Sequence, residues 1–590
     1  MATETLTQGG SWLIEDTAAD AVFTRERLND EQRMIGQTAQ EFIDKEVLPA
    51  LDRLEQKDWA LARALGQRCG ELGLLATDVP EAYGGLDLDK VSSVVVGEAV
   101  GRCASFATTF GAQTGLAITP ILCFGTDAQK QKYLPQLVTA ETIGAYALSE
   151  SGSGSDALGA RARATRLADG SFVLSGEKMW ITNGGFADVF IVFAKVDLQG
   201  TGGPGQGDGA FSAFIVERGF PGVTTGKEEH KLGLLGSSTT PLILQEAKVP
   251  AANLLGEIGK GHKIAFNTLN YGRLKLGAMC SGGARMAIEE SARYAAQRKQ
   301  FGKPIASFGA IRQKLGDMVS RQYAVEAMLY RTTGLIDGRL QDGHGPAQIL
   351  AALEEFAIEA SILKVASSET LDFILDENVQ IHGGNGFVRD YPAERHYRDA
   401  RVNRIFEGTN EINRLLIPGM LARRAVKGTL PLIPAAKRLM DEIMSPPAME
   451  AAGDGPLDAE RRAVAAMKKV ALMVLGTAMQ TYGLKLADEQ EVLLAAADIA
   501  IDTFASESAL LRAAQAGGPL HEAAARVFVN DAATRIDASA KTALAAMAEG
   551  DTLRTLLAAL RRVLKVTPIN TVVLRRQLAD ATVERKAYVF

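Results

Sequence analysis

The order of two sequence textures constrains the fold of this chain more than any other feature. Residues 171–176, 188–196, 211–217 and 239–250 are short runs rich in Val, Ile and Phe, as is typical of β-strands. Glycine-rich turns separate them, and the longest of these, residues 200–209, predicts a flexible connector. The segments on both sides carry helical periodicity instead. The sequence therefore predicts a β domain of roughly 100 residues within a helical protein.

Two helix starts are marked by residues that cap helices well. Asn29 and Asp30 open one periodic segment, and Thr126 precedes another whose first turn holds Asp127. Side chains of these types accept hydrogen bonds from the free N–H groups of a first helical turn. We therefore expect helices to begin at these two places.

The length of the chain predicts several domains. At 590 residues it is too long for one hydrophobic core. We expect an N-terminal helical domain over residues 1–145, the β domain over 146–255 and a second helical domain over 256–430. A C-terminal helical extension follows over residues 431–590. It begins near a Pro/Gly/Ala-rich linker, and its Ala/Leu-rich helical spacing predicts an antiparallel bundle.

Composition and charge exclude several classes of protein. The chain is 47% hydrophobic and 23% charged, as soluble globular proteins are, and its net charge of −6 gives no overall basic field for nucleic acid. The four cysteines stand apart, without the spacings of a disulfide framework or a zinc site, so we expect no metal. The N-terminus resembles neither a secretory signal nor a transit peptide, and no apolar run reaches membrane-spanning length. We expect a cytoplasmic protein of a prokaryote.

Five stretches combine glycines and small polar residues with aromatic ones. They are AYALSESGSGSD (145–156), KMWITNGGFAD (178–188), QRKQFGKPI (297–305), QIHGGNGFVRD (380–390) and RIFEGTNEINRLL (404–416). Each alone is weak, because such loops are usually only turns. Together, in this order and on an α–β–α background, they resemble the acyl-CoA dehydrogenase family of flavoproteins over about residues 30–425.

This resemblance implies a fold class and a cofactor. The family fold is α+β and mainly α, with an N-terminal helical domain, a central β-barrel or sandwich domain and a helical bundle, to which this chain adds its extension. FAD lies between the β domain and the second helical domain, and a neighbouring subunit also touches it.

The motifs assign FAD contacts residue by residue. Arg298 is expected at the diphosphate, because planar guanidinium donors reach two phosphate oxygens, with Phe301 packed nearby. His382 is expected to be a packing residue. The full set implied by the resemblance is Tyr146, Leu148, Ser149, Ser155, Trp180, Thr182, Arg298, Phe301, Gln380, Gly383, Gly384, Thr409 and Glu411.

Glu407 matches the catalytic base of the family. There, the Glu of Glu-Gly-Thr removes a proton next to a thioester carbonyl, and a hydride leaves the adjacent carbon for FAD. The N–H of this Glu and a ribityl hydroxyl of FAD polarise the carbonyl. An apolar surround from Ile405 and Phe406 is expected to raise the pKa of the carboxyl and strengthen the base. Thr409 is a good cap for the helix that follows.

One departure favours Glu407 as the sole base. Some members carry the base on the helix that corresponds to LNYGRLKLGA, immediately before an Arg, and here that position is Gly272. Arg273 matches a family Arg near the thioester and CoA. The substrate contacts that the resemblance implies are Ala107, Gly111, Ser155, Arg273, Phe406 and Gly408.

The acyl pocket is expected to be long. Ala107, Gly111 and Ala112 are small where medium-chain members carry larger polar residues, and each extra buried methylene contributes about 0.8 kcal/mol. With its extension the chain most resembles the very-long-chain acyl-CoA dehydrogenases. The extension there covers the surface that shorter members use to form tetramers, so we expect a homodimer, with long-chain acyl-CoA and electron-transfer flavoprotein as partners. The resemblance leaves open a peripheral contact with a membrane.

Two alternatives remain open from the sequence. A flavin acyl-CoA oxidase would pass its electrons to oxygen instead. A DNA-associated branch of the superfamily also carries a C-terminal helical extension, and it predicts a concentrated basic patch in residues 430–590. The basic runs LRRVLKV and LRRQL lie among acidic residues, which favours an enzyme without a nucleic-acid partner.

Overall fold

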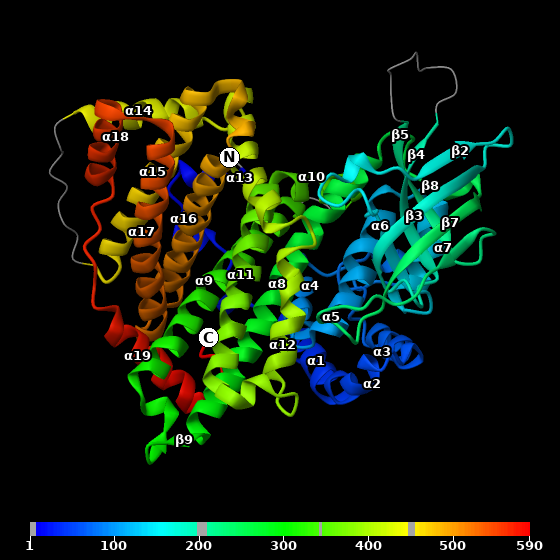
Figure 1. Ribbon diagram of the computed structural model, residues 1–590, viewed down its shortest axis with the longest axis horizontal. Coiled ribbons are helices and arrows are strands. Elements are labelled where there is room, and N and C mark those ends of the chain that lie inside the picture. Colours follow the sequence, from blue (N-terminus) through cyan, green and yellow to red (C-terminus); the bar gives the residue numbers. More distant parts are fainter. Residues whose placement is uncertain (1–6, 198–208, 342–344, 446–454) are drawn as a thin grey trace.

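The computed structural model describes residues 7–197, 209–341, 345–445 and 455–590. The connector predicted at 200–209 lies almost wholly outside these ranges, as does most of the linker into the extension. Three parts lie in a row: the β domain at one end, a central group of long helices, and the helical extension at the other end (Figure 1). The predicted fold class is confirmed.

The N-terminal region, which precedes the β domain in the chain, is helical, as predicted. Its main helices are α1 (Asp30–Phe42), α2 (Leu51–Glu55), α3 (Trp59–Glu71), α4 (Lys90–Val100), α5 (Ala104–Gly111), α6 (Thr119–Phe124) and α7 (Asp127–Val138). Asn29 caps α1 and Thr126 caps α7, and each forms a reciprocal pair with a Gln three residues later. Both predicted helix starts are therefore confirmed. Between α5 and α6 the chain widens into a π-helical segment, η7 (Ala112–Ile118).

The β domain is one mixed sheet of eight strands in the order β6-β7-β3-β2-β4-β5-β8, with β1 paired to β4. Its strands are β1 (Gly144–Ala147), β2 (Arg163–Arg166), β3 (Phe172–Thr182), β4 (Val189–Val196), β5 (Ala210–Glu217), β6 (Val223–Thr225), β7 (Thr239–Val249) and β8 (Leu254–Leu255). The four predicted strands are confirmed, although β3 runs six residues further than expected. The sequence missed β1, β2, β6 and β8, which are too short to show a period of two.

The central part consists of long helices: α8 (Gly261–Gln297), α9 (Gly309–Leu340), α10 (Pro346–Glu355), α11 (Ala357–His382), α12 (Ala393–Ala400) and α13 (Asn410–Lys427). A small hairpin of β9 (Lys299–Gln300) and β10 (Lys303–Pro304) follows α8. Turns η11 (Gly383–Phe387) and η12 (Arg401–Arg404) flank α12.

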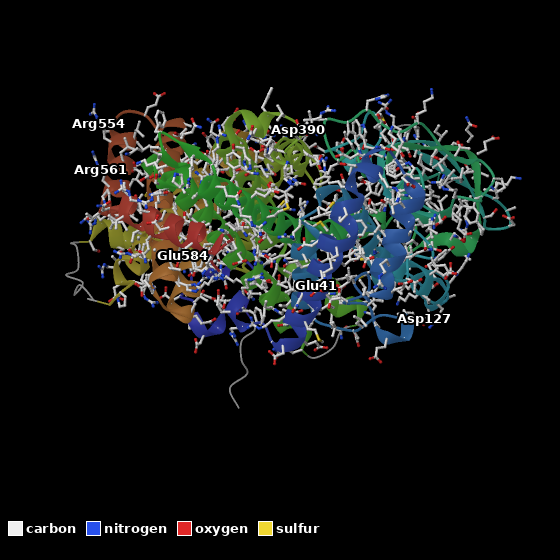
Figure 2. All side chains as sticks on the ribbon, turned by 90° about the horizontal axis from the view of Figure 1, so that it is seen from below. Glu41, Asp127, Asp390, Arg554, Arg561 and Glu584 are labelled. Carbon is white, nitrogen blue, oxygen red and sulfur yellow. The ribbon has the colours of Figure 1, made fainter. Side chains whose placement is uncertain are left out.

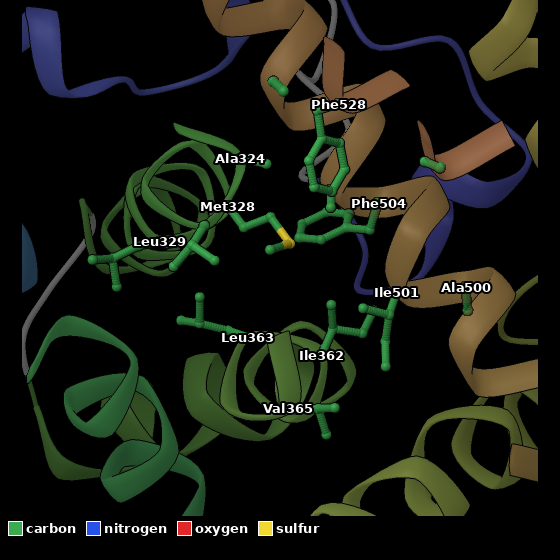
Figure 3. Close-up of a cluster of buried hydrophobic side chains, with 14 of the residues drawn as sticks. Ala324, Met328, Leu329, Ile362, Leu363, Val365, Ala500, Ile501, Phe504 and Phe528 are labelled. Carbon is green, nitrogen blue, oxygen red and sulfur yellow. The ribbon is translucent and has the colours of Figure 1, made fainter. Parts of the chain in front are cut away.

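The extension holds α14 (Leu432–Met444), α15 (Asp458–Tyr482), α16 (Gln490–Ala516), α17 (Pro519–Met547), α18 (Gly550–Val563) and α19 (Thr571–Arg585). The predicted bundle is confirmed, and the tail that the sequence left unassigned forms α19. Phe504 of α16 and Phe528 of α17 pack toward Met328 of α9 and Ile362 of α11 (Figure 3). The extension therefore shares one hydrophobic core with the central helices.

One helical stretch of the described residues, Asp458–Asp488, is long and apolar enough by length and composition to cross a membrane. The sequence analysis did not anticipate it. Most of the apolar segment of this stretch is buried inside the bundle, where α15 packs against α16 and α17. Its apolar character therefore serves the core of the extension.

Candidate active site

Glu407 lies on a strained turn between η12 and α13. Its backbone is left-handed (φ 58°), and Gly408 follows at φ 78°. A residue other than glycine in this region costs about 1–3 kcal/mol, which the surroundings must offset. Thr409 caps α13 by accepting a hydrogen bond from the N–H of Ile412 (3.2 Å), as predicted. The Asn413 amide donates to the carbonyls of Gly408 (2.8 Å) and Thr409 (3.0 Å), so the turn is fixed from both sides.

The Glu407 carboxylate faces a cavity. Its Oε2 is buried and unpaired among the described residues. Burial raises the pKa of this carboxyl to about 7, against the opposing charges of Arg273 and Lys364. A carboxyl of that pKa is a stronger base than an exposed glutamate, and about half of it is ionised at neutral pH.

The physical cause of this pKa differs in part from the sequence-based expectation. Phe406 lines the cavity beside Glu407, as predicted. Ile405 does not enclose the carboxylate, because its side chain is 53% exposed. The two hydrophobic residues point apart because the chain turns sharply here, from the end of η12 into the left-handed residue. Burial by the rest of the cavity replaces the contribution expected of Ile405.

Gly272 lies directly beside the base. A Cβ added at Gly272 would come within 2.6 Å of Glu407 Oε2. The position that carries the base in some acyl-CoA dehydrogenases therefore borders the same cavity. Here that position is Gly272, and its missing side chain leaves room for the Glu407 carboxylate. This geometry agrees with Glu407 as the sole acid at this point of the cavity.

Arg273 supports the backbone of the base. Its Nε donates to the Glu407 carbonyl (3.2 Å) and one terminal nitrogen donates to Asn270 (2.9 Å). The side chain is buried, and burial lowers the pKa of the guanidinium to about 10. It was expected near a bound thioester and CoA, and it does not itself line the cavity.

The cavity has a volume of about 110 Å³, enough for a segment of acyl chain. Thr182, Gly272, Phe406 and Glu407 line it, as do Lys275 and Met279 of α8. Nine of its lining residues are glycine or alanine, and six of these lie close together in the sequence: Gly101, Ala104, Ala107, Gly111, Ala112 and Gly115. Of the predicted substrate residues, the structure thus brings Ala107, Gly111 and Phe406 to the cavity, whereas Ser155 and Gly408 are not among its lining.

Predicted FAD residues of the β domain gather near Glu407. The Tyr146 hydroxyl is buried without a partner among the described residues, and burial followed by the Glu407 charge raises its pKa. Trp180 is 56% exposed and left-handed (φ 58°), on a bulge of β3. A bulge redirects a side chain out of the strand, and Thr182 beyond it lines the cavity. An orphaned hydroxyl and an exposed indole fit a flat aromatic group bound against this face.

The loop with Leu148, Ser149 and Ser155 is fixed by a buried ion pair that the sequence analysis missed. Lys178 Nζ lies 2.6 Å from Glu150 Oε1 and also donates to the Leu148 carbonyl (3.2 Å). The Glu150 carboxylate accepts the N–H groups of residues 161 and 162 as well. Leu148 is buried, Ser149 is partly exposed and Ser155 is exposed. A sign of this ion pair was available in the sequence: a lysine, Lys178, within a strand, β3, whose residues alternate between buried and exposed positions.

A second group of predicted FAD residues surrounds Tyr294. The Tyr294 hydroxyl donates to the His382 carbonyl (3.1 Å), and the rings of these two residues stack with centroids 4.1 Å apart. His382 is therefore a packing residue, as expected. Gln380 is exposed at the end of α11, and Gly383 and Gly384 are exposed in the turn that follows, where nothing lies within 4 Å of a Cβ added at either glycine.

Phe301 and Phe387 project from this second group. Phe301 is 91% exposed and left-handed (φ 51°), in the hairpin directly after Arg298, and Phe387 is 86% exposed. The hairpin lies at the far side of the molecule from the β domain (Figure 1). Within a single chain, the predicted FAD residues near Glu407 and those around Tyr294 therefore do not form one site. Two predicted FAD contacts remain. The Thr409 hydroxyl accepts the capping hydrogen bond of α13, and Glu411 is exposed on that helix.

Comparison with known proteins identifies the class to which this fold and site belong. Family models of the acyl-CoA dehydrogenase N-terminal domain match residues 29–141, the middle domain 145–247, and two C-terminal domains 259–421 and 466–562. A probable acyl-CoA dehydrogenase of Bacillus subtilis (strain 168) is 49% identical over 98% of both chains. The human mitochondrial short-chain specific acyl-CoA dehydrogenase is 38% identical over 68% of this chain and 92% of its own.

Solved structures agree. A Bacillus anthracis acyl-CoA dehydrogenase complexed with FAD is 47% identical, with a TM-score of 0.95 over 99% of this chain and 100% of its own. Butyryl-CoA dehydrogenase from Megasphaera elsdenii gives 0.61 at 37% identity, over 67% of this chain and 99% of its own. The protein is thus an FAD-dependent oxidoreductase. It belongs to the acyl-CoA dehydrogenase family.

Proposed function

We propose that this enzyme dehydrogenates long- or very-long-chain acyl-CoA to trans-2-enoyl-CoA, as a step of fatty-acid β-oxidation, with Glu407 as the catalytic base. The observation that carries the proposal is the buried Glu407 carboxylate, unpaired at Oε2 and open to a cavity lined by small residues. Such a carboxylate has no structural partner among the described residues, so a proton of the substrate is its natural one.

The chain supplies the base and a donor for the carbonyl. In the proposed step, Glu407 takes the proton from the carbon next to the thioester carbonyl. The Glu407 N–H makes no backbone hydrogen bond within the described residues and is available to the thioester oxygen, where negative charge develops. Arg273 and Asn413 hold this N–H and the carboxylate in one orientation. Bound FAD supplies the acceptor for the hydride that leaves the next carbon.

The proposed chain length rests on the six small residues that the segment 101–115 contributes to the cavity wall. Each additional buried methylene contributes about 0.8 kcal/mol, so a deep cavity favours long chains. Several shorter relatives, such as the human mitochondrial one, are named short-chain specific, while the full-length Bacillus relative carries no chain length in its name. The extension that distinguishes those two groups is present here.

Anaerobic reduction of bound FAD tests this function across saturated acyl-CoAs from 4 to about 20 carbons. We expect the second-order rate constant for flavin bleaching to rise to an optimum at 12 carbons or more. An optimum at 4 to 6 carbons would overturn the proposed chain length but not the reaction. Absence of bleaching at every length would overturn the reaction itself.

We propose electron-transfer flavoprotein as the electron acceptor. A flavin oxidase is the competing reading, and the two differ in what reoxidises the reduced enzyme. Peroxide release during turnover with palmitoyl-CoA, with and without the flavoprotein, separates them. We expect turnover to depend on the flavoprotein, with little peroxide; rapid peroxide formation in air would favour the oxidase.

A homodimer completes the proposed cofactor site. The exposed Phe301, and the exposed Phe387 in the open Gly383–Gly384 turn, support it, because large exposed aromatic side chains favour burial against a partner. We expect sedimentation to give a dimer that weakens when FAD is removed. A stable FAD-loaded monomer would contradict this arrangement.

We propose a cytoplasmic enzyme without a nucleic-acid partner. Arg554 and Arg561 project from the outer end of the extension (Figure 2), and Arg554 already pairs with Asp551 at 2.7 Å. Pairing of this kind weakens a basic field. For a peripheral membrane contact, α14 is the candidate, since it exposes Ile433, Met440 and Met444. Co-sedimentation with anionic vesicles tests that contact, and protein that stays in the supernatant would exclude it.

A further inference from the structure

Lys364 is a buried charged residue for which the proposed reaction has so far no role. It lies in α11, and its neighbours Ile362, Leu363 and Val365 belong to the hydrophobic core (Figure 3). The side chain is fully buried. In the described part of the chain its ammonium forms no ion pair within 4 Å, and it donates a hydrogen bond to Asn410 Oδ1 at 2.6 Å. A buried ammonium without a carboxylate partner is costly, so it persists only where a specific role offsets that cost.

Asn410 joins this lysine to the turn that carries the base. It is the first residue of α13, three positions after Glu407. While its Oδ1 accepts from Lys364, its Nδ2 donates to Ser368 (3.1 Å) and to Glu369 Oε1 (2.9 Å), both on α11. All of these bonds hold the start of α13 against one face of α11. A shift of Lys364 would therefore move the Glu407 turn as well.

The polar chain continues into the extension. Arg414 of α13 forms a bidentate pair with Glu369, at 2.6 and 2.8 Å. Its remaining nitrogen, Nε, donates to Asp498 Oδ1 of α16 at 2.7 Å. Bidentate guanidinium pairs are strong and directional, so they fix geometry as well as charge. An unbroken series of polar contacts thus runs from the extension to Lys364.

The titratable groups that face Glu407 come from three packed elements. Arg273 approaches from α8, Lys364 from α11, and the Tyr146 hydroxyl from β1, and Lys275 of α8 lines the same cavity as Glu407. Arg273 is already bound to the Glu407 carbonyl and to Asn270. The charged groups around Lys364 are Glu407, Arg273 and Glu411, together with the Cys280 thiol, and burial lowers the pKa of its ammonium to about 8. Among the described residues neither Arg273 nor Lys364 has a carboxylate within 4 Å, and Lys364 is the one of the two that is bonded to the first residue of α13, Asn410.

We propose that Lys364 is a positioning residue for Glu407: it anchors the base-bearing turn through Asn410 and supplies a positive charge to the catalytic carboxylate, and Asp498 of the extension holds this arrangement through Arg414 and Glu369. The inference rests on the proposed role of Glu407 as base. It gives the extension a function in catalysis in addition to its share of the hydrophobic core. The effect is reached through contiguous hydrogen bonds and ion pairs, so it can be broken at either end.

The first test replaces the charge at Lys364. In FAD-loaded Lys364→Met, loss of a nearby cation favours protonated Glu407, so the acid limb of the kcat/KM profile moves to higher pH, by roughly one unit. Lys364→Gln keeps a donor for Asn410 and loses only the charge. We expect it to show the same shift with a higher plateau rate than Lys364→Met, and it also serves if Lys364→Met fails to fold.

Two controls make the outcome specific. Lys468→Met removes another buried lysine, one that pairs with Glu507 of the extension, and the limb stays in place. An unmoved limb in both Lys364 variants, with a normal FAD content, would overturn the proposal. If Glu407→Gln still reduced its flavin, the base assignment itself would fail, which is a different result.

The second test breaks this series of polar contacts at its end in the extension. Asp498→Asn removes the partner of Arg414 Nε, and we expect flavin reduction at its plateau to slow two- to fivefold, at unchanged FAD content. Asp502→Asn is the matched control, one turn further along α16, because its pair with Arg535 lies wholly within the extension. In a Glu369→Gln background the effect of Asp498→Asn disappears. Equal rates for the two single variants would overturn the role of the extension.

Discussion

The cavity around Glu407 and the loops around Tyr294 present their residues in opposite ways. At the cavity, the base sits in a turn fixed by Arg273, Asn413 and the cap of α13, and its carboxylate is buried. At the loops, Phe301 is 91% exposed and the glycines face open space. The first region is organised by a single chain, whereas the second has side chains that only another molecule can cover. Chemistry and cofactor retention should therefore respond to different substitutions.

Glu407→Gln is expected to have the largest effect. Gln has nearly the same shape but cannot accept the proton, so anaerobic flavin reduction by palmitoyl-CoA falls at least about a thousandfold. FAD content remains normal, because the loops around Tyr294 are untouched. Stopped-flow bleaching and the visible spectrum give the two readings. Reduction within tenfold of wild type would remove Glu407 from the mechanism.

Arg298→Gln is expected to act on the other region. Loss of a charge-assisted contact to a phosphate weakens FAD binding about ten- to a hundredfold. Molecules that retain FAD reduce it at the wild-type rate, since the cavity is intact. Fluorescence of released FAD measures the affinity. The control is Arg293→Gln, at an exposed arginine in the last turns of α8, just before Arg298, that pairs with Glu289; this variant retains FAD. Equal retention by both variants would mean that the hairpin does not contact the cofactor.

Gly111→Leu narrows the cavity. An added Cβ there meets the Met279 methyl at 3.2 Å, and the rest of the side chain takes the space of several methylenes. We expect the ratio of palmitoyl-CoA to butyryl-CoA reactivity to fall about tenfold or more, at about 0.8 kcal/mol per methylene lost. Gly419→Leu, a helical glycine with nothing within 4 Å of the added Cβ, leaves the ratio unchanged. An unaltered ratio in Gly111→Leu would place the acyl chain elsewhere.

The pH dependence of the wild-type enzyme reports on the same cavity. Burial raises the Glu407 pKa to about 7, and only the ionised carboxylate accepts a proton. Activity is therefore full above this value and falls as pH drops through it. At pH 6 we expect kcat/KM to be about tenfold below its plateau. Stopped-flow reduction at several pH values checks this, and a limb near the ordinary pKa of glutamate would contradict the burial of the base.

Ile405→Ser is expected to have the smallest effect. The side chain is largely exposed, so the Glu407 pKa and the acid limb stay in place. Phe406→Ser, at the residue that does line the cavity, admits water and lowers the limb toward the ordinary range of a glutamate. The pair of pH profiles measures which neighbour desolvates the base. A shift in Ile405→Ser alone would reverse the assignment made from the structure.

The sequence predicted the long helices and strands of the fold better than the short ones. The long helices, the capping residues Asn29 and Thr126, and the four longer strands carry periods or hydrogen-bonding side chains that act locally. Strands of two to four residues, such as β6 and β8, have no such local signal and exist through their partners in the sheet. The tail that became α19 likewise depends on its packing against α9 and α17.

For the site, the sequence by itself determined the motif that carries Glu407, the cap that follows it and the absence of an acid at Gly272. These are statements about residue identity and local spacing. Only the tertiary structure decided that Ile405 points away, that Gly272 lies against the carboxylate, and that Lys364 is tied to the base through Asn410. Burial and charge at the site depend on which segments, far apart in the sequence, come together in the fold. No local stretch of the chain specifies those contacts.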